Sequence, residues 1–321
     1  MQKAGDILKR LPVVQKAKKE APFLTPSYLK LLDIAATIRL DPDAIERAFM
    51  ARQLVQCTLP HSNPGDVPVF TRRNGNLTLT IQPGWDTRKN MSAGFPYGTI
   101  PRLLLFWVTT EAVRTKSRRL QLGRSLAGFM REVGLNADTG GGKRGDAKRL
   151  RNQLERLFRC RISFDQVLTR DDGAEGNRWL DMQVAPKGEF WWDVKQPEQA
   201  TLWESWIELG EDFFKAVTAA PVPIDMRALR ALRRSPLALD LYAWATYRTF
   251  SVNRKGAAQF IPWQGLMRQM GCEYKDPKNF KHEAQLALRK VRSVFPALKI
   301  SRARGGFNLH PGATAVPSAL P

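Results

Sequence analysis

The spacing of apolar residues predicts two runs of helices, each followed by a pair of strands. Within each run, apolar positions first recur at helical spacing and then alternate. In the first run the predicted helices are 101–116, 125–133 and 146–159, and the strands are 161–168 and 178–184. In the second run the helices are 235–250, 263–270 and 279–294, and the strands are 298–302 and 307–310. Helix, helix, turn, helix and hairpin is the order of a winged helix.

The two runs are diverged copies of one unit. Residues 107–158 align with residues 244–295 at a constant offset of 137 and without a gap. The alignment holds eight identities in 52 positions, where average residue usage gives roughly 3. Substituted positions keep their character, as where Leu157 meets Val294. We therefore expect two similar domains.

The segments outside the copies predict an extension and a boundary. One short helix is expected after Thr25-Pro26, and a second after Asp41 with Pro42 at its first position. Strands at 69–71 and 77–81 flank Asn74-Gly75, a hairpin signal. A strand at 206–209 and a helix at 211–218 complete the first domain, and Pro221-Val222-Pro223 forms a stiff boundary. The predicted fold is α+β, with an N-terminal helical extension (1–60), two tandem winged-helix domains (61–219 and 220–310) and a flexible tail (311–321).

Charge follows the repeat. The chain has a net charge of +21, and residues 114–161 hold 14 Lys/Arg against 4 Asp/Glu. Residues 227–304 hold 17 against 4, whereas residues 162–226 hold 5 against 13. Cationic blocks that coincide with the two copies favour nucleic-acid binding over a merely solvated basic surface.

Other sequence features favour a soluble protein of the cytoplasm. No apolar run approaches the length of about 18 residues that spans a bilayer, and Met1–Glu20 lacks the hydrophobic core of a secretory signal. Cys57, Cys160 and Cys272 form no Cys-x-x-Cys pair, which argues against a disulfide framework and a zinc site.

The last helix of each copy is the predicted recognition helix. In the first copy, Lys148, Arg149, Asn152 and Arg156 point away from an apolar stripe, with Arg151 at its border. In the second copy, Gln and Arg residues face outward, and both types read base edges in the major groove. Leu286 also faces outward, toward either a thymine methyl group or a partner protein. The predicted DNA-binding residues are Arg124, Lys143, Arg144, Lys148, Arg149, Arg151, Asn152, Arg156, Lys278, Lys281, His282, Gln285, Arg289, Arg292, Lys299, Arg302 and Arg304. Contact with phosphates alone is the alternative role for each of them.

The two predicted hairpins differ in charge. The second carries Lys299, Arg302 and Arg304 beside Gly305-Gly306, which suits a phosphate or minor-groove contact. The first carries Asp171 and Asp172 in its loop. We expect this acidic loop to stay off DNA or to meet a protein.

Catalytic chemistry is not predicted. The run Gly140–Lys143 suggests a phosphate loop, but Ala137 stands where the motif needs Gly and Arg144 where it needs Ser or Thr. His61, His282 and His310 are far apart in the sequence, so no metal site or cofactor is expected.

Several stretches resemble the RepA family of plasmid replication initiators. They are Pro96–Leu103, Thr110–Thr115, Leu122–Leu126, Gly141–Gly145, Arg73–Asn76, Leu79–Gly84 and Ser235–Trp244. The resemblance covers about residues 55–310. It implies tandem winged helices that bind repeated sites (iterons) in a plasmid origin, help to open the duplex and recruit the host initiator and replicative helicase. It also implies self-association linked to copy-number control.

The sequence thus predicts a non-enzymatic, sequence-specific initiator that binds double-stranded origin DNA. A transcriptional regulator or autorepressor on the same scaffold is the first alternative. A nucleic-acid enzyme and a basic protein of the membrane surface are the others, and the membrane alternative is disfavoured because the basic helices use their other face for a core.

Overall fold

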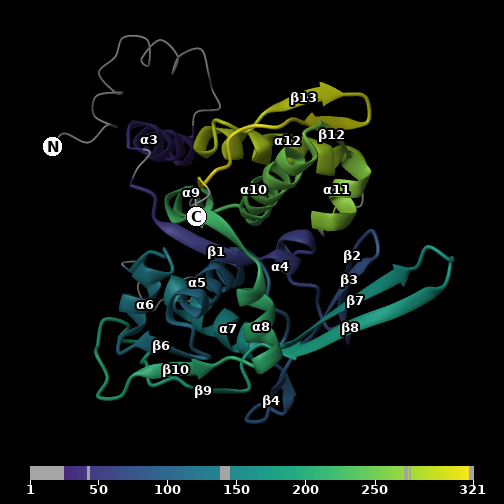
Figure 1. Ribbon diagram of the computed structural model, residues 1–321. Helices are drawn as coiled ribbons and strands as arrows, with labels where there is room; N and C mark the ends of the chain where they lie inside the picture. Colours follow the sequence, from purple (N-terminus) through teal and green to yellow (C-terminus); the bar gives the residue numbers. More distant parts are fainter. Residues whose placement is uncertain (1–24, 42–43, 138–144, 271–273, 275, 318–321) are drawn as a thin grey trace, which may run out of the picture.

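The computed structural model describes residues 25–41, 44–137, 145–270, 274 and 276–317. Figure 1 shows the second copy above the first, with strand β1 crossing between them. The helices are α3 (Pro26–Leu40), α4 (Arg52–Gln56), α5 (Thr99–Thr115), α6 (Leu126–Glu132), α7 (Asp146–Arg159), α8 (Glu211–Ala219), α9 (Met226–Leu232), α10 (Pro236–Lys255), α11 (Trp263–Met270) and α12 (Pro277–Val294). The strands are β1 (Arg47–Ala51), β2 (Phe70–Asn74), β3 (Leu77–Gln82), β4 (Trp85–Asp86), β5 (Met91–Ser92), β6 (Arg119–Gly123), β7 (Arg161–Thr169), β8 (Glu175–Gln183), β9 (Lys187–Glu189), β10 (Ser205–Glu208), β11 (Pro221–Asp225), β12 (Gln259–Pro262), β13 (Ile300–Ala303) and β14 (Gly306–Leu309). The predicted α+β class is confirmed.

The first helix of each copy is buried on nearly all sides. In α5, residues 100–109 are all buried, and the helix packs against β1, α7, α8 and α10. In α10, residues 237–246 are all buried. Helices that are apolar all round belong inside a protein, so α5 and α10 form the centre of their copies and meet each other across the middle of the molecule.

One hydrogen bond recurs in both copies and supports the alignment. Trp107 Nε1 donates to Glu132 Oε1 at 2.8 Å, and Trp244 Nε1 donates to Gln269 Oε1 at 3.1 Å. Both tryptophans and both acceptors lie 137 positions apart in the sequence. Both copies thus keep a hydrogen bond from a tryptophan of their first helix to their second helix, although the acceptor is a carboxylate in one copy and an amide in the other.

The second copy has the strand arrangement of a winged helix. Strands β12, β14 and β13 form an antiparallel sheet in that order, with α10, α11 and α12 beside it. Gly306 is required in this sheet, because a Cβ there would lie 2.1 Å from the carbonyl oxygen of Ile261. Strand β12, which the sequence did not predict, supplies the third strand that holds the β13–β14 hairpin against the helices.

The first copy departs from that arrangement. Its hairpin β7–β8 joins β2 and β3 in a four-stranded sheet, while β6 pairs with β10. In the four-stranded sheet Leu79 lies opposite Phe164, and Ile81 opposite Ile162, so the buried side chains share one face. Burial of that face attaches the hairpin to β3 rather than to β6. Figure 1 shows β7 and β8 projecting well beyond the helices.

Helix α3 and strand β1 pack against the two copies, and the helix expected after Asp41 is wrong. Pro42 lies outside the described residues, and residues 44–46 are not helical. The chain then forms β1, whose Phe49 amide donates to Thr110 Oγ1 of α5. Pairing with β11, far along the chain, overrides the local helix signal. Helix α3, by contrast, begins after Thr25 as expected and packs against α9 and α12.

The expected boundary is a paired strand, and the expected flexible tail needs correction. Pro221-Val222-Pro223 lies in strand β11, paired with β1. Phe49 lies opposite Pro223 and donates its amide to Thr110 rather than to β11, so the missing N–H of Pro223 removes no hydrogen bond from this pair. The described part of the tail, residues 311–317, packs against the protein. Val316 is buried, and Asn253 of α10 exchanges two hydrogen bonds with Gly312.

Candidate nucleic-acid interface

Helix α12 presents a polar face between two flanking elements. Asp276 caps the helix by accepting from the Lys278 amide at 2.8 Å, and Pro277 takes the first position. Its buried stripe packs against α10 and α11. The side chains on the opposite side are exposed: Lys278, Lys281, His282, Gln285, Arg289 and Arg292.

A groove of about 260 Å³ separates α12 from the β13–β14 hairpin. It brings together side chains from both elements that the sequence predicted to bind DNA: Lys281, Gln285, Arg289, Arg292 and Arg302. Lys299 and Arg304 are also exposed on the hairpin, on either side of Arg302 in the sequence. The groove therefore combines hydrogen-bonding groups that suit base edges with cations that suit phosphates.

Leu286 has a role that the sequence did not predict. It lines a cavity of about 600 Å³ together with Tyr28 and Leu31 of α3, and Arg39 of α3 donates to the Ser293 carbonyl of α12 at 3.4 Å. Leu286 is half-buried and faces α3 across this cavity, and it does not line the groove beside the hairpin. Helix α3 covers the side of α12 that lies opposite the hairpin.

Only some of the predicted DNA-binding side chains of helix α7 are exposed. Lys148, Arg149 and Asn152 are exposed, and Arg149 forms an ion pair with Asp146 at 3.1 Å. Near the start of the preceding helix, Arg124 is exposed and lies 3.5 Å from Glu204. Lys143 and Arg144 lie outside the described residues.

Two predicted contacts on α7 are occupied within the protein. Arg156 donates to the Phe95 carbonyl at 3.2 Å and lies over the ring of Tyr97. Arg151 pairs with Glu155 at 3.0 Å and lies over the ring of Phe190. Both guanidinium groups hold neighbouring segments against α7, so the exposed side chains of its predicted face lie in its first two turns.

The acidic loop of the first hairpin lies at the far end of a projection. Asp172 accepts from the Ala174 amide at 3.0 Å, which closes the turn, and Asp171 is exposed. Trp179, further along β8, is 70% exposed. This hairpin presents carboxylates and apolar surface, in contrast to the basic hairpin of the second copy.

A buried ion pair joins the two copies. Arg102 of α5 is 2% exposed and donates to both carboxylate oxygens of Asp240 on α10, at 2.7 and 2.8 Å. Its remaining hydrogen bonds go to the carbonyls of Leu59, Pro60 and Gly98. The relative position of α5 and α10 is therefore fixed by a fully paired guanidinium group.

His61 completes this buried network. Its Nε2 lies 2.7 Å from Asp240 Oδ2. Burial, followed by the charge of Arg102, lowers the pKa of His61 despite the opposing effect of Asp240. Burial by itself raises the pKa of Asp240, but the charge of Arg102 and the hydrogen bonds from His61 and Arg102 outweigh it and leave that pKa lowered.

Sequence reasoning missed this network, although a signal was present. Arg102 is the one charged residue in the apolar stretch 100–108, and Asp240 is the one charged residue in 235–247. A lone charge in a buried helix requires a partner. Two such helices in one chain are therefore candidates to pair with each other.

Comparison with known proteins identifies the family. The family model described as plasmid encoded RepA protein matches residues 95–265. The chain belongs to the RepA family. The matched region runs from the residue before Pro96 into α11, and it includes Arg102, Asp240 and all of α7. Helix α12 lies beyond it, so the RepA match covers the junction of the copies but not the second recognition helix.

Other comparisons find only distant similarity for this RepA-family chain. A crystal structure of domains 2 and 3 of RctB matches at 10% sequence identity and a TM-score of 0.48, covering 78% of this chain and 93% of that one. That likeness is too distant to bear on function. No curated protein matches the chain significantly.

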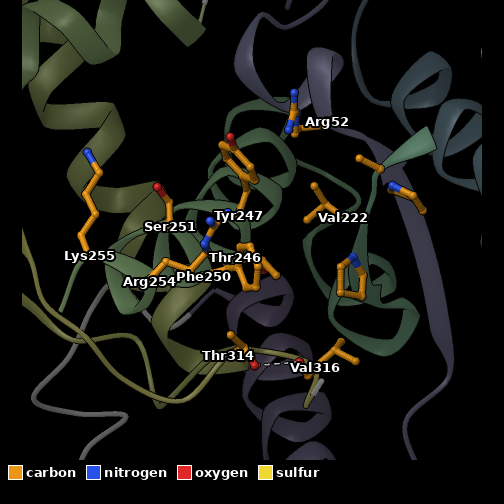
Figure 2. A pocket seen from close by; sticks show the side chains of 13 residues that line it. Arg52, Val222, Thr246, Tyr247, Phe250, Ser251, Arg254, Lys255, Thr314 and Val316 are labelled. Atoms are coloured by element: carbon orange, nitrogen blue, oxygen red, sulfur yellow. Dashed lines mark hydrogen bonds between the residues drawn. The ribbon is translucent and has the colours of Figure 1, made fainter. Parts of the chain in front are cut away.

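A further pocket lies away from both recognition helices. It has a volume of about 650 Å³ and lies between α10, β11 and residues 314–316 (Figure 2). Figure 2 shows Val222, Phe250 and Val316 among its apolar side chains, with Arg52, Arg254 and Lys255 around them. None of its lining residues belongs to α7 or α12.

Neither a metal cluster nor a membrane span is found in the part of the chain that the structure describes. No group of three or more His, Cys, Asp or Glu residues there could hold a metal ion. Among the same residues, no helix combines the length and the apolar character needed to cross a membrane.

Proposed function

We propose that the protein is a plasmid replication initiator that binds repeated sites in its origin through the last helices of its two copies. The observation that carries the proposal is the groove between α12 and the basic hairpin, where Gln285 and Arg289 lie beside Lys281, Arg292 and Arg302. Membership of the RepA family supports replication as the purpose of this binding.

The buried ion pair supports the use of both copies on one DNA molecule. Because Arg102 and Asp240 join α5 to α10, the two recognition helices have a fixed relative position before DNA is bound. We propose that they enter successive major grooves on one face of the duplex, about one helical turn apart. Opening of the origin, recruitment of the host initiator and helicase, and self-association belong to the same proposal and rest on the family resemblance.

Footprinting with the purified full-length chain on the DNA flanking its own gene tests this function. A tandem array of similar protected sites supports an initiator, whereas a single promoter palindrome favours the autorepressor alternative. Absence of protection at low salt would refute specific DNA binding.

Variants of α12 then test the groove. Gln285→Ala and Arg289→Ala should each weaken binding to the protected site by roughly 1–3 kcal/mol and relax the base preference at one position. Lys255→Ala, at the end of α10 and outside the groove, is the control and should leave the base preference unchanged. An equal loss on all sequences would show that these side chains contact phosphates only.

A further inference from the structure

A short hairpin that the sequence did not predict rests on the end of helix α7. It consists of β4 and β5, with Trp85 opposite Ser92, and Figure 1 shows β4 at the lower end of the first copy. A Cβ at Gly84 would lie 2.5 Å from both Cβ and the carbonyl oxygen of Arg159. On the other side, a Cβ at Gly94 would lie 3.0 Å from the guanidinium carbon of Arg156. Glycine at both ends thus lets the hairpin sit directly on the last turn of α7.

Hydrogen bonds fix the hairpin in this position. Arg159 donates to the Trp85 carbonyl at 3.2 Å, and the Ala93 amide donates to the Gly84 carbonyl at 2.8 Å. Within the turn, Asp86 accepts from the amides of Arg88 and Lys89 at 3.0 and 3.2 Å. The hairpin is therefore ordered before any ligand arrives, which lowers the entropy cost of binding.

The surface of the hairpin is cationic and carries an exposed aromatic ring. The Asp86 carboxylate forms an ion pair with Lys89, but the Asp86 side chain is only 16% exposed, whereas that of Lys89 is 66% exposed. Arg88 is exposed beside it. Trp85 is 55% exposed, although burial of an indole ring is strongly favourable. Cations around an exposed aromatic ring suit a polyanion that offers flat apolar groups.

The hairpin continues the exposed stripe of α7. At 100° per residue, Lys148, Asn152 and Arg159 fall within about 40° of one another around the helix. Arg159 lies eleven positions after Lys148, so the two are roughly 16 Å apart along the helix axis, compared with a major groove about 12 Å wide. If the start of α7 lies in a major groove, the Arg159 end of the helix lies at the edge of that groove. The β4–β5 hairpin at this end therefore reaches the phosphate backbone.

We propose that the β4–β5 hairpin is the DNA-contacting arm of the first copy, in place of the acid-tipped β7–β8 hairpin. Arg88 and Lys89 contact phosphates at the edge of the groove. Trp85 packs against sugars or base edges of the adjoining minor groove, where apolar side chains are commonly inserted. This inference rests on the proposed DNA-binding function.

Salt-dependent binding by the full-length chain tests the arm. The probe is a duplex selected by the wild-type chain from a random pool, and affinity is measured between 50 and 200 mM salt. Each lost phosphate contact lowers the slope of log K against log salt by about 0.9. Arg88→Ala should lower the slope by that amount, and Arg88→Ala/Lys89→Ala should lower it by about 1.8. The ratio of wild-type affinity to double-variant affinity should then become roughly 12-fold smaller between 50 and 200 mM salt.

Two further variants complete the test. Trp85→Ala should weaken binding roughly fivefold or more without changing the slope, because the contact of an uncharged ring with sugars or base edges releases no ions. Arg254→Ala/Lys255→Ala removes the same charge at the far end of α10 and should leave the slope unchanged. All variants alter exposed residues, and their circular dichroism and melting temperature should match those of the wild type.

The outcomes separate the inference from the function. If the wild-type chain selects no duplex, the proposed function fails. If it selects one but the Arg88 and Trp85 variants bind it as the wild type does, only the arm is refuted. Equal losses in the hairpin variants and the Arg254/Lys255 control would also refute the arm, because net charge would then explain the effect.

Discussion

Replacement of Arg102 by methionine is expected to destabilise the whole protein. The substitution keeps most of the side-chain volume but removes both hydrogen bonds to Asp240 and the three to the carbonyls of Leu59, Pro60 and Gly98. Asp240 is then left as a buried carboxylate with His61 beside it. Breaking one side of a buried ion pair costs about 3–5 kcal/mol. The folding equilibrium constant should therefore fall by a factor between roughly one hundred and several thousand.

Urea unfolding followed by tryptophan fluorescence measures this cost. The control is Arg114→Met, which removes an ion pair with Glu111 on the surface of α5 and should change little, because Arg114 is well exposed. Adding Asp240→Leu to Arg102→Met should restore part of the lost stability, since no buried charge is then uncompensated. The carbonyls of Leu59, Pro60 and Gly98 still lose their hydrogen bonds from Arg102, which keeps the double variant below the wild type.

Two results would refute this reasoning. A loss of less than about 1 kcal/mol in Arg102→Met would show that the pair does not hold the copies together. A double variant less stable than Arg102→Met would show that packing around Asp240, and not its uncompensated charge, determines the cost.

Three further predictions follow from the same structure. The pKa of folded His61 lies below its ordinary value of 6.5, so on acidification the unfolded chain binds a proton before the folded protein does. The free energy of unfolding should therefore fall as the pH drops below about 6.5. Urea titrations should show that this free energy falls less steeply with pH in His61→Gln, and an equal fall in both proteins would contradict the assignment. Burial raises the pKa of the Cys57 and Cys160 thiols to about 12, so mass spectrometry should find neither residue alkylated by iodoacetamide at pH 8 until the protein is denatured; modification in the native state would disprove their burial. Asp171→Lys/Asp172→Lys should leave DNA affinity unchanged or increase it, and a weaker complex in a binding titration would show that the acidic loop takes part in DNA binding.

The helices could be predicted from the sequence because their signals are local. The bounds of α7 and α11 agree with the prediction to the residue, since an apolar stripe and a nearby turn fix each of them. The repeat also directed attention to α12, whose exposed face carries the predicted polar residues. The β4–β5 hairpin gave little signal, because strands of two residues are too short to show alternation.

The sequence by itself determined the three helices of each copy, the repeat and the distribution of positive charge, because each depends on residues that are close together in the chain. Only the tertiary structure decided which strands pair, which of the predicted cations stay exposed, and how the copies are joined. Strand β1 pairs with β11, Leu286 faces α3, and Arg156 holds Phe95 against α7. The physical reason is the same in each case: these contacts join residues distant in sequence, and burial of shared surface selects among partners that no local pattern distinguishes.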